Sequence, residues 1–302
     1  MKKPASSTLL VSHKFGRLGN RLVFYGHVIA FACEYGLSAA NVAFRGYSKG
    51  FLHASEDALF RFPPRRSFFP RSLVSPLGRL VERLCDSSNR MVLFLKRCLK
   101  FTHLSVGVTA PTRVWDESFS HDVKDYRITA LSGWLFRCPE LFKKHQKTIR
   151  AFFKIHPKFE KPALERIDAF NPDKKILVGV HIRRGDYKEW ADGRYYYSME
   201  TYRKWMDQVA RHFGEDSVSF VICSSEPIDS NYFSGLRILA GGDSLYGDLV
   251  LMSACNYLFG PPSTFSEFSS FYGEVPLCWM RSEDENVNLA KFSICEVLTE
   301  PN

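Results

Sequence analysis

Short apolar runs alternate with segments of helical periodicity through the second half of the chain. The runs cover residues 176–182, 217–224, 237–240, 256–260 and 275–280. Continuous apolar runs of this length are typical of parallel strands that are buried on both faces. Apolar residues at helical spacing separate several of them, at 198–213, at 248–255 and after Ser263. This order of strands and helices predicts a doubly wound α/β domain.

The first half opens with the same alternation. A strand at 8–13 precedes a glycine-containing loop at 16–20, a helix with apolar positions at 22–33 and a second strand at 41–44. Helical spacing returns at 77–100 and 139–154, whereas 62–76 is rich in proline and arginine and is expected to lack regular structure. The chain of 302 residues is long enough for two domains, which we place at 1–160 and 161–302.

Positive charge is concentrated in one segment. The chain has a net charge of +9, and residues 61–100, here called the basic segment, hold ten Lys and Arg residues against two acidic residues, a local net charge of +8. Such a segment attracts anionic membranes, polyanionic glycans or nucleic acid. It contains no nucleic-acid recognition motif, so we expect peripheral contact with an anionic membrane and no nucleic-acid partner.

The cysteines indicate a reducing compartment. All eight are scattered, without CxxC pairs, and several lie in apolar runs, so we expect them to be reduced and buried and the protein to be cytoplasmic. The first residues contain an apolar run that is too short for a signal peptide, and no stretch is long enough to span a bilayer. Any membrane contact is therefore expected to be peripheral, on the inner membrane face.

Charged residues cluster where the 176–182 strand ends. His181, Arg183, Arg184 and Asp186 lie at its carboxyl end, which is the edge where open α/β sheets bind ligands. Two adjacent arginines offer fork-shaped donors that suit a phosphate or pyrophosphate. The alternative is a surface Arg–Asp cluster that only closes the strand.

Three other places in the sequence suit an anion or a nucleotide. Gly19 and Asn20 lie in a predicted strand-to-helix loop, where the backbone can approach a ligand; the alternative is a tight turn. Asp248 begins an apolar helix and could accept hydrogen bonds from a purine or ribose, although acidic residues are common in a first helical turn. Hydroxyl groups gather at another helix start, as a phosphate cradle or an ordinary N-cap, at Ser263, Thr264 and Ser266.

Three stretches of this sequence carry a family resemblance. HIRRGDYKEWADGRYYYSMETY, which begins at His181, resembles the signature of the glycosyltransferase family eleven α-1,2-fucosyltransferases and of the wider fucosyltransferase superfamily. GRLGNRLVFY at 16–25 is similar to the amino-terminal loop of that family, and DLVLMSACNYLFGPPSTFSEF at 248–268 resembles its carboxyl-terminal motif. The three stretches occur in the order and spacing of the family.

The resemblance implies a GT-B fold, in which two Rossmann-like domains face a central cleft. Residues 1–160 would form the acceptor-side domain, with a helical and basic insertion, and residues 161–302 the donor-binding domain. The implied reaction is an inverting, metal-independent transfer of L-fucose from GDP-fucose to a hydroxyl group, O-2 of galactose, on a glycan or lipid-linked oligosaccharide. No cofactor is expected besides this donor substrate.

The resemblance also implies roles for individual residues. Arg183 would contact the β-phosphate of the donor and neutralise the charge that develops on GDP, with Arg184 and His181 in support. Asp248 falls where relatives hold the guanine or ribose, and Ser266 with Thr264 where they hold the β-phosphate. The alternatives are a transferase that uses another GDP-sugar and a non-catalytic glycan- or polyanion-binding protein on the same scaffold.

An inverting transfer needs a group that takes the proton of the acceptor hydroxyl. Asp186, Glu189 and Asp192 follow the arginines within one loop. Asp186 lies two residues from Arg184, so we expect it to orient the guanidinium groups. Glu189 or Asp192 is the expected base, because both lie further out towards an approaching acceptor.

Overall fold

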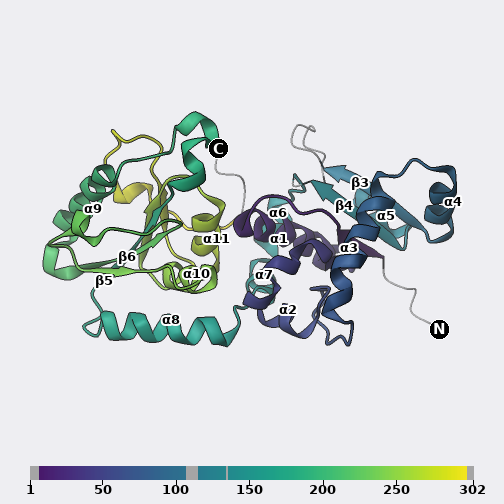
Figure 1. Ribbon diagram of the computed structural model, residues 1–302, viewed down its shortest axis with the longest axis horizontal. Helices are drawn as coiled ribbons and strands as arrows, with labels where there is room; N and C mark the ends of the chain where they lie inside the picture. The colour runs from purple at the N-terminus through teal and green to yellow at the C-terminus, as the bar shows by residue number, and fades with distance from the viewer. Residues whose placement is uncertain (1–6, 107–114, 134, 298–302) are drawn as a thin grey trace. The chain divides into compact units, whose positions relative to one another are not determined.

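The protein folds into two compact units, residues 1–156 and 157–302. The computed structural model describes residues 7–106, 115–133 and 135–297. Each unit contains one sheet of parallel strands with helices packed against it (Figure 1). The boundary between the units in the sequence falls immediately before helix α8 (Pro157–Phe170), whereas the predicted boundary is residue 160. The predicted α/β class, with two Rossmann-like sheets, is confirmed.

The first unit is built on a four-stranded sheet in the order β2-β1-β4-β3. Its strands are β1 (Thr8–Val11), β2 (Ser38–Asn41), β3 (Phe101–Val106) and β4 (Ile128–Gly133). β1 pairs in parallel with both β2 and β4. The first strand of the unit is therefore central in its sheet, and the loop after it reaches the middle of the carboxyl edge.

Helices cover this first sheet. They are α1 (Leu18–Tyr35), α2 (Leu52–Glu56), α3 (Arg71–Asp86), α4 (Arg90–Cys98), α5 (Glu117–Lys124), α6 (Pro139–Lys144) and α7 (Gln146–Phe152). α3 packs Val74, Val81 and Cys85 against Leu10 and Ala40 of the strands. These α3 residues recur at i, i+7 and i+11, so one stripe of the helix is buried and the rest of its surface is left outside the core.

Three expectations for the first unit were wrong in detail. The strand expected at 41–44 lies at Ser38–Asn41, because the Asn41 side chain accepts a hydrogen bond from the Ala43 backbone N–H and a 3₁₀ helix, Val42–Gly46, follows. The helical segment expected at 77–100 is two helices, since Asn89 caps a new one. α3 begins at Arg71, inside the stretch that was expected to be irregular.

The second unit has a five-stranded parallel sheet in the order β7-β6-β5-β8-β9. The strands are β5 (Ile176–Ile182), β6 (Val218–Ser224), β7 (Ile238–Ala240), β8 (Tyr257–Gly260) and β9 (Leu277–Trp279). Besides α8, its helices are α9 (Met199–Phe213), α10 (Leu245–Ser253) and α11 (Thr264–Gly273). The strands and helices expected in this half of the chain are confirmed.

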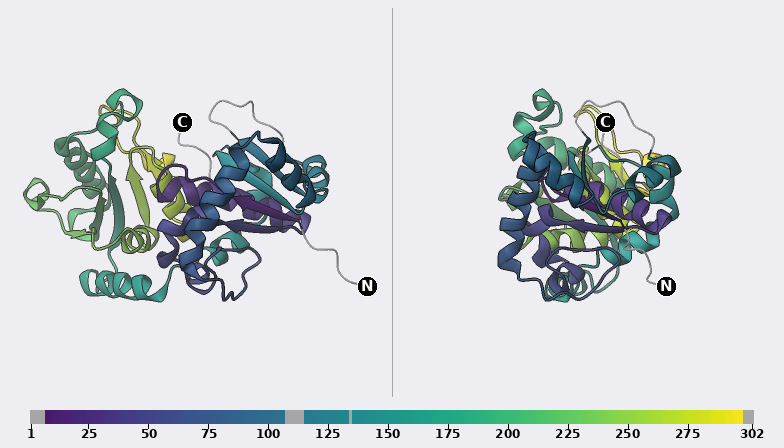
Figure 2. Two further views of the ribbon diagram at one scale, coloured as in Figure 1. Left: turned by 45° about the vertical axis from the view of Figure 1, so that its right-hand side comes forward. Right: turned by 90° about the vertical axis from the view of Figure 1, so that its right-hand side faces the viewer.

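The order of the strands reverses at the central strand β5. The chain continues from β5 to β6 and β7 on one side, and then crosses to β8 and β9 on the other. α9 packs on the face of the sheet that carries Val178 and Val180. On the opposite face, Gly179 lies against Leu258 and Cys255. Figures 1 and 2 show helices on both faces of the sheet. The point where strand order reverses, between β5 and β8, is where such sheets bind ligands.

Gly260 lets the ends of β5 and β8 come close together. It has a φ of +154°, and a Cβ atom at this position would lie 2.5 Å from the backbone oxygen of His181. Only glycine fits such an approach without a shift of the backbone. The loops after β5 and β8 therefore begin side by side at the carboxyl edge of the sheet.

The cysteines agree only in part with the expectation. All eight are free, and most are buried, but Cys98 on α4 is exposed. The exposed position follows from α4 itself, which has no buried residue. No helix in the described part of the chain combines the length and the apolarity that crossing a bilayer requires.

Candidate functional site

Arg183 is held rigidly at the carboxyl end of β5. Its guanidinium group donates to the carboxylate of Asp186 at 2.8 Å, and its Cζ lies 4.8 Å from the ring centre of Tyr187. The side chain is 15% exposed, and its buried Nε has no hydrogen-bond partner among the described residues. The guanidinium is therefore oriented by a carboxylate and an aromatic ring and keeps one donor unused, as a site for an oxyanion requires.

Arg184 is fixed by different partners. It donates to the Tyr197 backbone oxygen at 3.2 Å and to the Tyr196 hydroxyl at 2.6 Å, and its Nε lies 3.6 Å from a carboxylate oxygen of Glu226. Glu226 also accepts a hydrogen bond of 2.8 Å from the Gly185 backbone N–H. The loop after β6 thus holds the loop after β5, and Arg184 supports the local backbone.

Tyrosine hydroxyl groups connect the loops of this edge. Tyr187, in the 3₁₀ turn Gly185–Lys188, donates at 2.6 Å to the backbone oxygen of Pro262 in the loop after β8. The hydroxyl of Tyr202 on α9 accepts a hydrogen bond of 3.2 Å from the Arg183 backbone N–H. Both tyrosines are buried, so these contacts restrict the position of Arg183 from two sides.

His181 is neutral in this environment. The side chain is buried beside Phe265, with 5.4 Å between ring centres, and Nδ1 has no hydrogen-bond partner in the part of the chain that the structure describes. Burial and, to a smaller extent, the positive charge of Arg183 together lower the pKa of His181 to about 3. The imidazole therefore adds no positive charge near neutral pH and can offer only a neutral hydrogen-bonding atom.

The hydroxyl groups at the start of α11 are largely engaged within the helix. Ser263 is the N-cap and accepts from the Phe265 backbone N–H at 3.2 Å. Ser266 is fully buried and donates to the Ser263 backbone oxygen at 3.0 Å, and Thr264 is the first helical residue. Ser263 is therefore an N-cap. The N-terminus of α11 lies beside the end of β5, because β8 pairs with β5. The role of Ser263, Thr264 and Ser266 as a phosphate cradle stays a prediction.

Asp248 lies in the first turn of α10 at the same sheet edge. Its carboxylate accepts a hydrogen bond of 2.7 Å from the Gly242 backbone N–H, and a Cβ on Gly241 would lie 2.5 Å from its Oδ1. The residue is 8% exposed, and burial raises its pKa to about 6, although the Gly242 N–H acts in the opposite direction. Asp248 therefore fixes the glycine turn after β7 and carries a destabilised charge at neutral pH.

The candidate bases Glu189 and Asp192 lie further along the chain from β5 than Asp186 does. Asp186 is an ion-pair partner of Arg183, which agrees with the expected orienting role. Glu189 and Asp192 are exposed and lie in or next to the turn Trp190–Gly193, where Ala191 and Asp192 adopt left-handed backbone conformations with φ of 52° and 55°. The choice between Glu189 and Asp192 as base stays a prediction.

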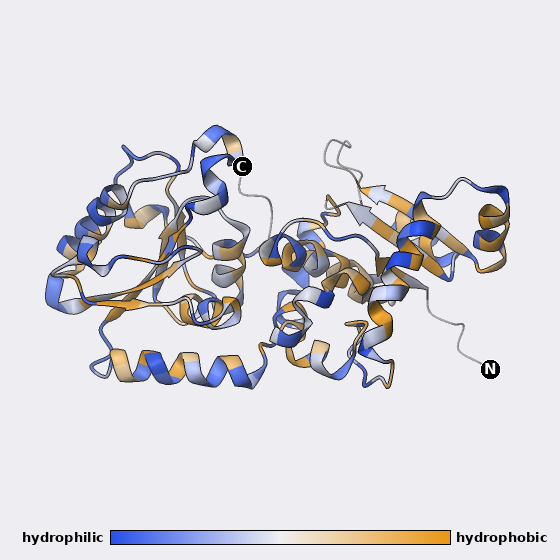
Figure 3. Ribbon diagram, viewed as in Figure 1, coloured by the Kyte–Doolittle hydropathy of each residue, from blue (hydrophilic) through white to orange (hydrophobic). Residues whose placement is uncertain are grey.

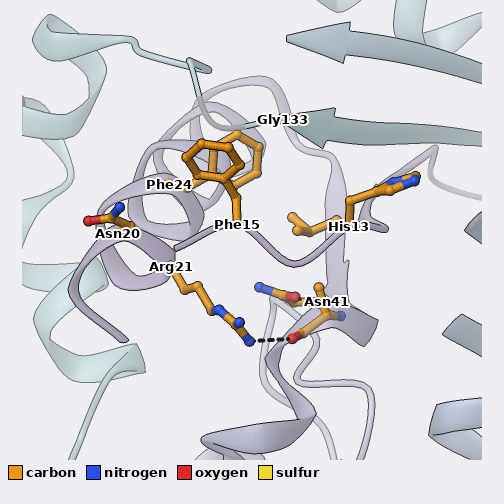
Figure 4. Close-up of a pocket in the computed structure, with 9 residues that line it drawn as sticks. His13, Phe15, Asn20, Arg21, Phe24, Asn41 and Gly133 are labelled. Carbon is orange, nitrogen blue, oxygen red and sulfur yellow. Dashed lines mark hydrogen bonds between the residues drawn. The ribbon is translucent and has the colours of Figure 1, made fainter. Parts of the chain in front are cut away.

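The carboxyl edge of the first sheet has a pocket of its own. Among its lining residues are His13, Phe15, Asn20 and Arg21 (Figure 4), and the Arg21 guanidinium donates to the backbone oxygen of Ala43 at 3.0 Å. Gly19 and Asn20 belong to the first turn of α1 rather than to the loop that was expected, because the helix begins at Leu18. Asn20 lines the pocket, whereas Gly19 is buried in the helix.

A polar group at this edge was not among the predicted site residues. His13 accepts from or donates to the Ser12 hydroxyl at 2.8 Å through Nδ1, and its Nε2 lies 3.9 Å from Asp86 at the end of α3. His103 on β3 stacks on His13 at 6.2 Å between ring centres. The same signal that pointed to Arg183, a polar residue directly after an apolar strand, was present for His13.

In the residues that the structure describes, no three His, Cys, Asp or Glu side chains gather as metal ligands. Two parallel α/β units, with Arg183 and Arg184 at the switch point of the second, form the kind of sheet edge where doubly wound α/β domains bind nucleotides. The family model of glycosyl transferase family 11 matches residues 73–274, and the chain belongs to this family.

Solved structures share the fold at low sequence identity. A mutant of Arabidopsis thaliana FUT1 in complex with GDP is 11% identical over 97% of this chain and 74% of that chain, with a TM-score of 0.59. POFUT1 in complex with GDP is 12% identical over 93% of this chain and 98% of that chain, with a TM-score of 0.50. NodZ alpha-1,6-fucosyltransferase from Bradyrhizobium, soaked with GDP-fucose, is 16% identical over 95% of this chain and 97% of that chain, with a TM-score of 0.50. No curated protein matches the chain in sequence.

Proposed function

We propose that this chain transfers L-fucose from GDP-fucose to a hydroxyl group of a glycan, with inversion and without a metal ion. The observation that carries the proposal is the Arg183 guanidinium, oriented by Asp186 and Tyr187 at the switch point between β5 and β8, with a buried donor atom unused. GDP or GDP-fucose in the solved structures of FUT1, POFUT1 and NodZ supports the donor.

In this mechanism Arg183 binds the β-phosphate and stabilises the charge that accumulates on GDP as the glycosidic bond to fucose breaks. A fixed cation at a departing pyrophosphate acts mainly on the transition state, because the charge is greater there than in the ground state. Arg183 supplies this charge from the protein, so the proposed reaction needs no metal.

The other donor contacts follow from the same edge. Asp248 would bind the guanine or ribose, with its carboxylate already positioned by the Gly242 N–H. The N-terminus of α11, with Ser263, Thr264 and Ser266, would direct backbone N–H groups towards a phosphate. Neutral His181 would complete the site without adding charge. Donor contacts by Gly19 and Asn20 stay a prediction from the sequence.

The acceptor hydroxyl loses its proton as it attacks the anomeric carbon of fucose. Glu189 or Asp192 would take this proton, since both carboxylates are exposed, whereas Asp186 is committed to Arg183. We further propose galactose O-2, on a glycan or lipid-linked oligosaccharide, as the acceptor position, from the resemblance of the His181–Tyr202 stretch to α-1,2-fucosyltransferases. The proposed location is the cytoplasm.

Isothermal titration of the full chain with GDP, GDP-fucose, GDP-mannose and UDP-galactose tests the proposal. We expect GDP and GDP-fucose to bind and UDP-galactose to fail. Absence of guanine-nucleotide binding would overturn the proposal. Glycan binding that is indifferent to GDP-fucose, with no turnover, would instead identify a non-catalytic glycan-binding protein, and preference for GDP-mannose would identify another donor.

A further inference from the structure

Helix α4 exposes an apolar face. Met91, Phe94, Leu95 and Cys98 follow the spacing i, i+3, i+4 and i+7, which places them on one side of a helix. Met91 is 73% exposed, Phe94 66% and Leu95 45%, and α4 has no buried residue. A helix of this composition leaves its apolar side chains in water unless something covers them.

The sequence around α4 carries charge of a single sign. Between Asp86 and Asp116 the sequence contains no acidic residue. The ammonium group of Lys96 donates to the backbone oxygens of Cys85 and Ser87, which ties α4 to the end of α3. Arg90 and Arg97 are exposed, and Figure 3 shows apolar and charged residues side by side on α4. A surface that covers α4 must therefore be anionic as well as apolar.

Helix α3 repeats the pattern on its outer surface. Leu73 is 48% exposed and Leu80 54%, and Arg79 and Arg83 are exposed beside them. The buried stripe of α3 already faces the sheet, so these side chains make no contribution to the core of the unit. Two successive helices of the basic segment thus mix exposed leucine and phenylalanine with arginine.

We propose that α4 docks the first unit on an anionic phospholipid surface. Met91, Phe94 and Leu95 enter the boundary between headgroups and acyl chains, while Arg90 and Arg97 bind lipid phosphates. A basic helix with aromatic and aliphatic residues on one face is the type that lies in a membrane interface. A lipid surface supplies both the apolar medium and the negative charge that the two faces of α4 require.

Sedimentation of the full chain with vesicles tests this proposal. Vesicles of phosphatidylcholine alone are compared with vesicles of phosphatidylcholine and phosphatidylglycerol in equal amounts. We expect binding to the anionic vesicles and little to the neutral ones. Because neither nucleotide nor glycan is present, the result is independent of the proposed transferase activity.

Two kinds of variant locate the contact. Phe94→Asp removes an inserting side chain and adds a negative charge, and should weaken vesicle binding by about tenfold or more. Arg97→Glu should do so by a similar factor, at about fivefold per unit of charge. The matched controls are Leu164→Asp on α8, where the leucine is 41% exposed, and Lys204→Glu on α9, where the lysine is exposed. Both controls should bind vesicles like the wild type.

Each remaining outcome decides the question. Equal binding to neutral vesicles would overturn the requirement for an anionic surface, and no loss in Phe94→Asp would overturn insertion of α4. Met91→Asp gives the same test of insertion if Phe94→Asp fails to fold. Failure to bind any vesicle would overturn membrane docking, and light scattering would then show whether a second copy covers the face, as a dimer that Phe94→Asp dissociates. A dye attached at exposed Cys98 should shift its emission to shorter wavelength on anionic vesicles only.

Discussion

Arginine serves two different purposes in this protein. At the carboxyl edge of the second sheet, the side chains of Arg183 and Arg184 are 15% and 25% exposed, and each faces a carboxylate and an aromatic ring. On α4, Arg90 and Arg97 are exposed, and the sequence supplies no acidic residue between Asp86 and Asp116. The same cation is held in one fixed geometry in the first setting and is free to adapt in the second.

This difference predicts different dependence on geometry and on salt. A guanidinium oriented by fixed partners can select a phosphate by shape, because the fork must match two oxygens. Exposed cations respond to the charge density of whatever approaches, and their interactions are screened over about 8 Å at physiological salt. Substitutions that change the shape of the side chain should therefore weaken ligand binding most at Arg183 and Arg184. Changes of charge or of salt concentration should weaken binding most at α4.

The largest effect is expected for Arg183→Lys. Lysine keeps the charge but cannot reproduce a bidentate fork, so turnover should fall by about 10²–10³ while the protein stays folded. The matched control is Arg203→Lys, because Arg203 also donates to a carboxylate at 2.8 Å, that of Asp207, but lies on α9. Transfer rates and melting temperatures of both variants provide the measurement, and unchanged kinetics in Arg183→Lys would remove the central residue of the proposal.

The carboxylates after β5 should separate into two functions. Asp192→Asn or Glu189→Gln should lower kcat by about 10², flatten the acidic limb of the pH–rate profile and leave GDP affinity nearly unchanged. Asp186→Asn should instead weaken GDP binding, because Arg183 loses the partner that orients it. Measuring kcat and GDP affinity for all three variants makes the distinction. Full kcat with a normal acidic limb in both outer variants would point to a transfer that needs little base catalysis.

Salt should separate the two arginine settings. Raising the salt concentration to about 1 M shortens the screening length to about 3 Å, so vesicle binding should weaken by about tenfold or more. GDP affinity should change less, because Arg183 is mostly withdrawn from solvent. Vesicle sedimentation and GDP titration over the same salt series provide the measurement. Equal salt dependence would mean that the two settings do not differ as the burial indicates.

The two sheets also differ in how well the sequence predicts them. β5 and β6 are continuous apolar runs buried on both faces, and both were predicted. β3 contains Thr102, His103 and Ser105, and only its first and last residues are buried, so it has no apolar run to detect. β2 lies earlier than predicted because it ends at Asn41, whose side chain accepts a hydrogen bond from the Ala43 backbone N–H at the start of a 3₁₀ helix.

The same contrast holds for the site. Arg183, Arg184 and Asp186 are adjacent in sequence, so one motif contains them. Glu226 comes from the loop after β6, outside the motif, and only the fold brings it to the β5 edge. Tyr202 ends the same motif, but its contact with the Arg183 backbone N–H follows from its place on α9. The strand pairing that brings Glu226 to this edge depends on contacts that a linear pattern does not contain. Exposure of α4 was likewise hidden, because its apolar spacing equals that of a core helix.

The smallest effect is expected at Asp248, the other buried charge of the site. Burial raises its pKa from 3.8 to about 6, so the folded state binds the proton more tightly than the unfolded state does. The stability that this group contributes is therefore present at low pH and is lost as the pH rises through about 6. Asp248→Asn keeps the acceptor for the Gly242 N–H and removes the charge, as protonation does.

Above pH 6 the Asp248→Asn variant should be more stable than the wild type. The shift corresponds to at most about 3 kcal/mol at about 1.4 kcal/mol per pH unit, and we expect about 1 kcal/mol because the new amide N–H group needs a partner. The gain should disappear as the pH falls below about 4, where the wild-type carboxyl is protonated in both states. His181 titrates in both proteins, so its contribution cancels in the difference between them.

Melting temperatures of both proteins from pH 4 to about 8 provide the measurement, with a gain of a few degrees expected only at the upper end of this pH range. A gain that is the same at every pH would show that the Asp248 charge is not its cause, and a loss of GDP affinity in the same variant would connect the destabilised carboxylate to nucleotide binding.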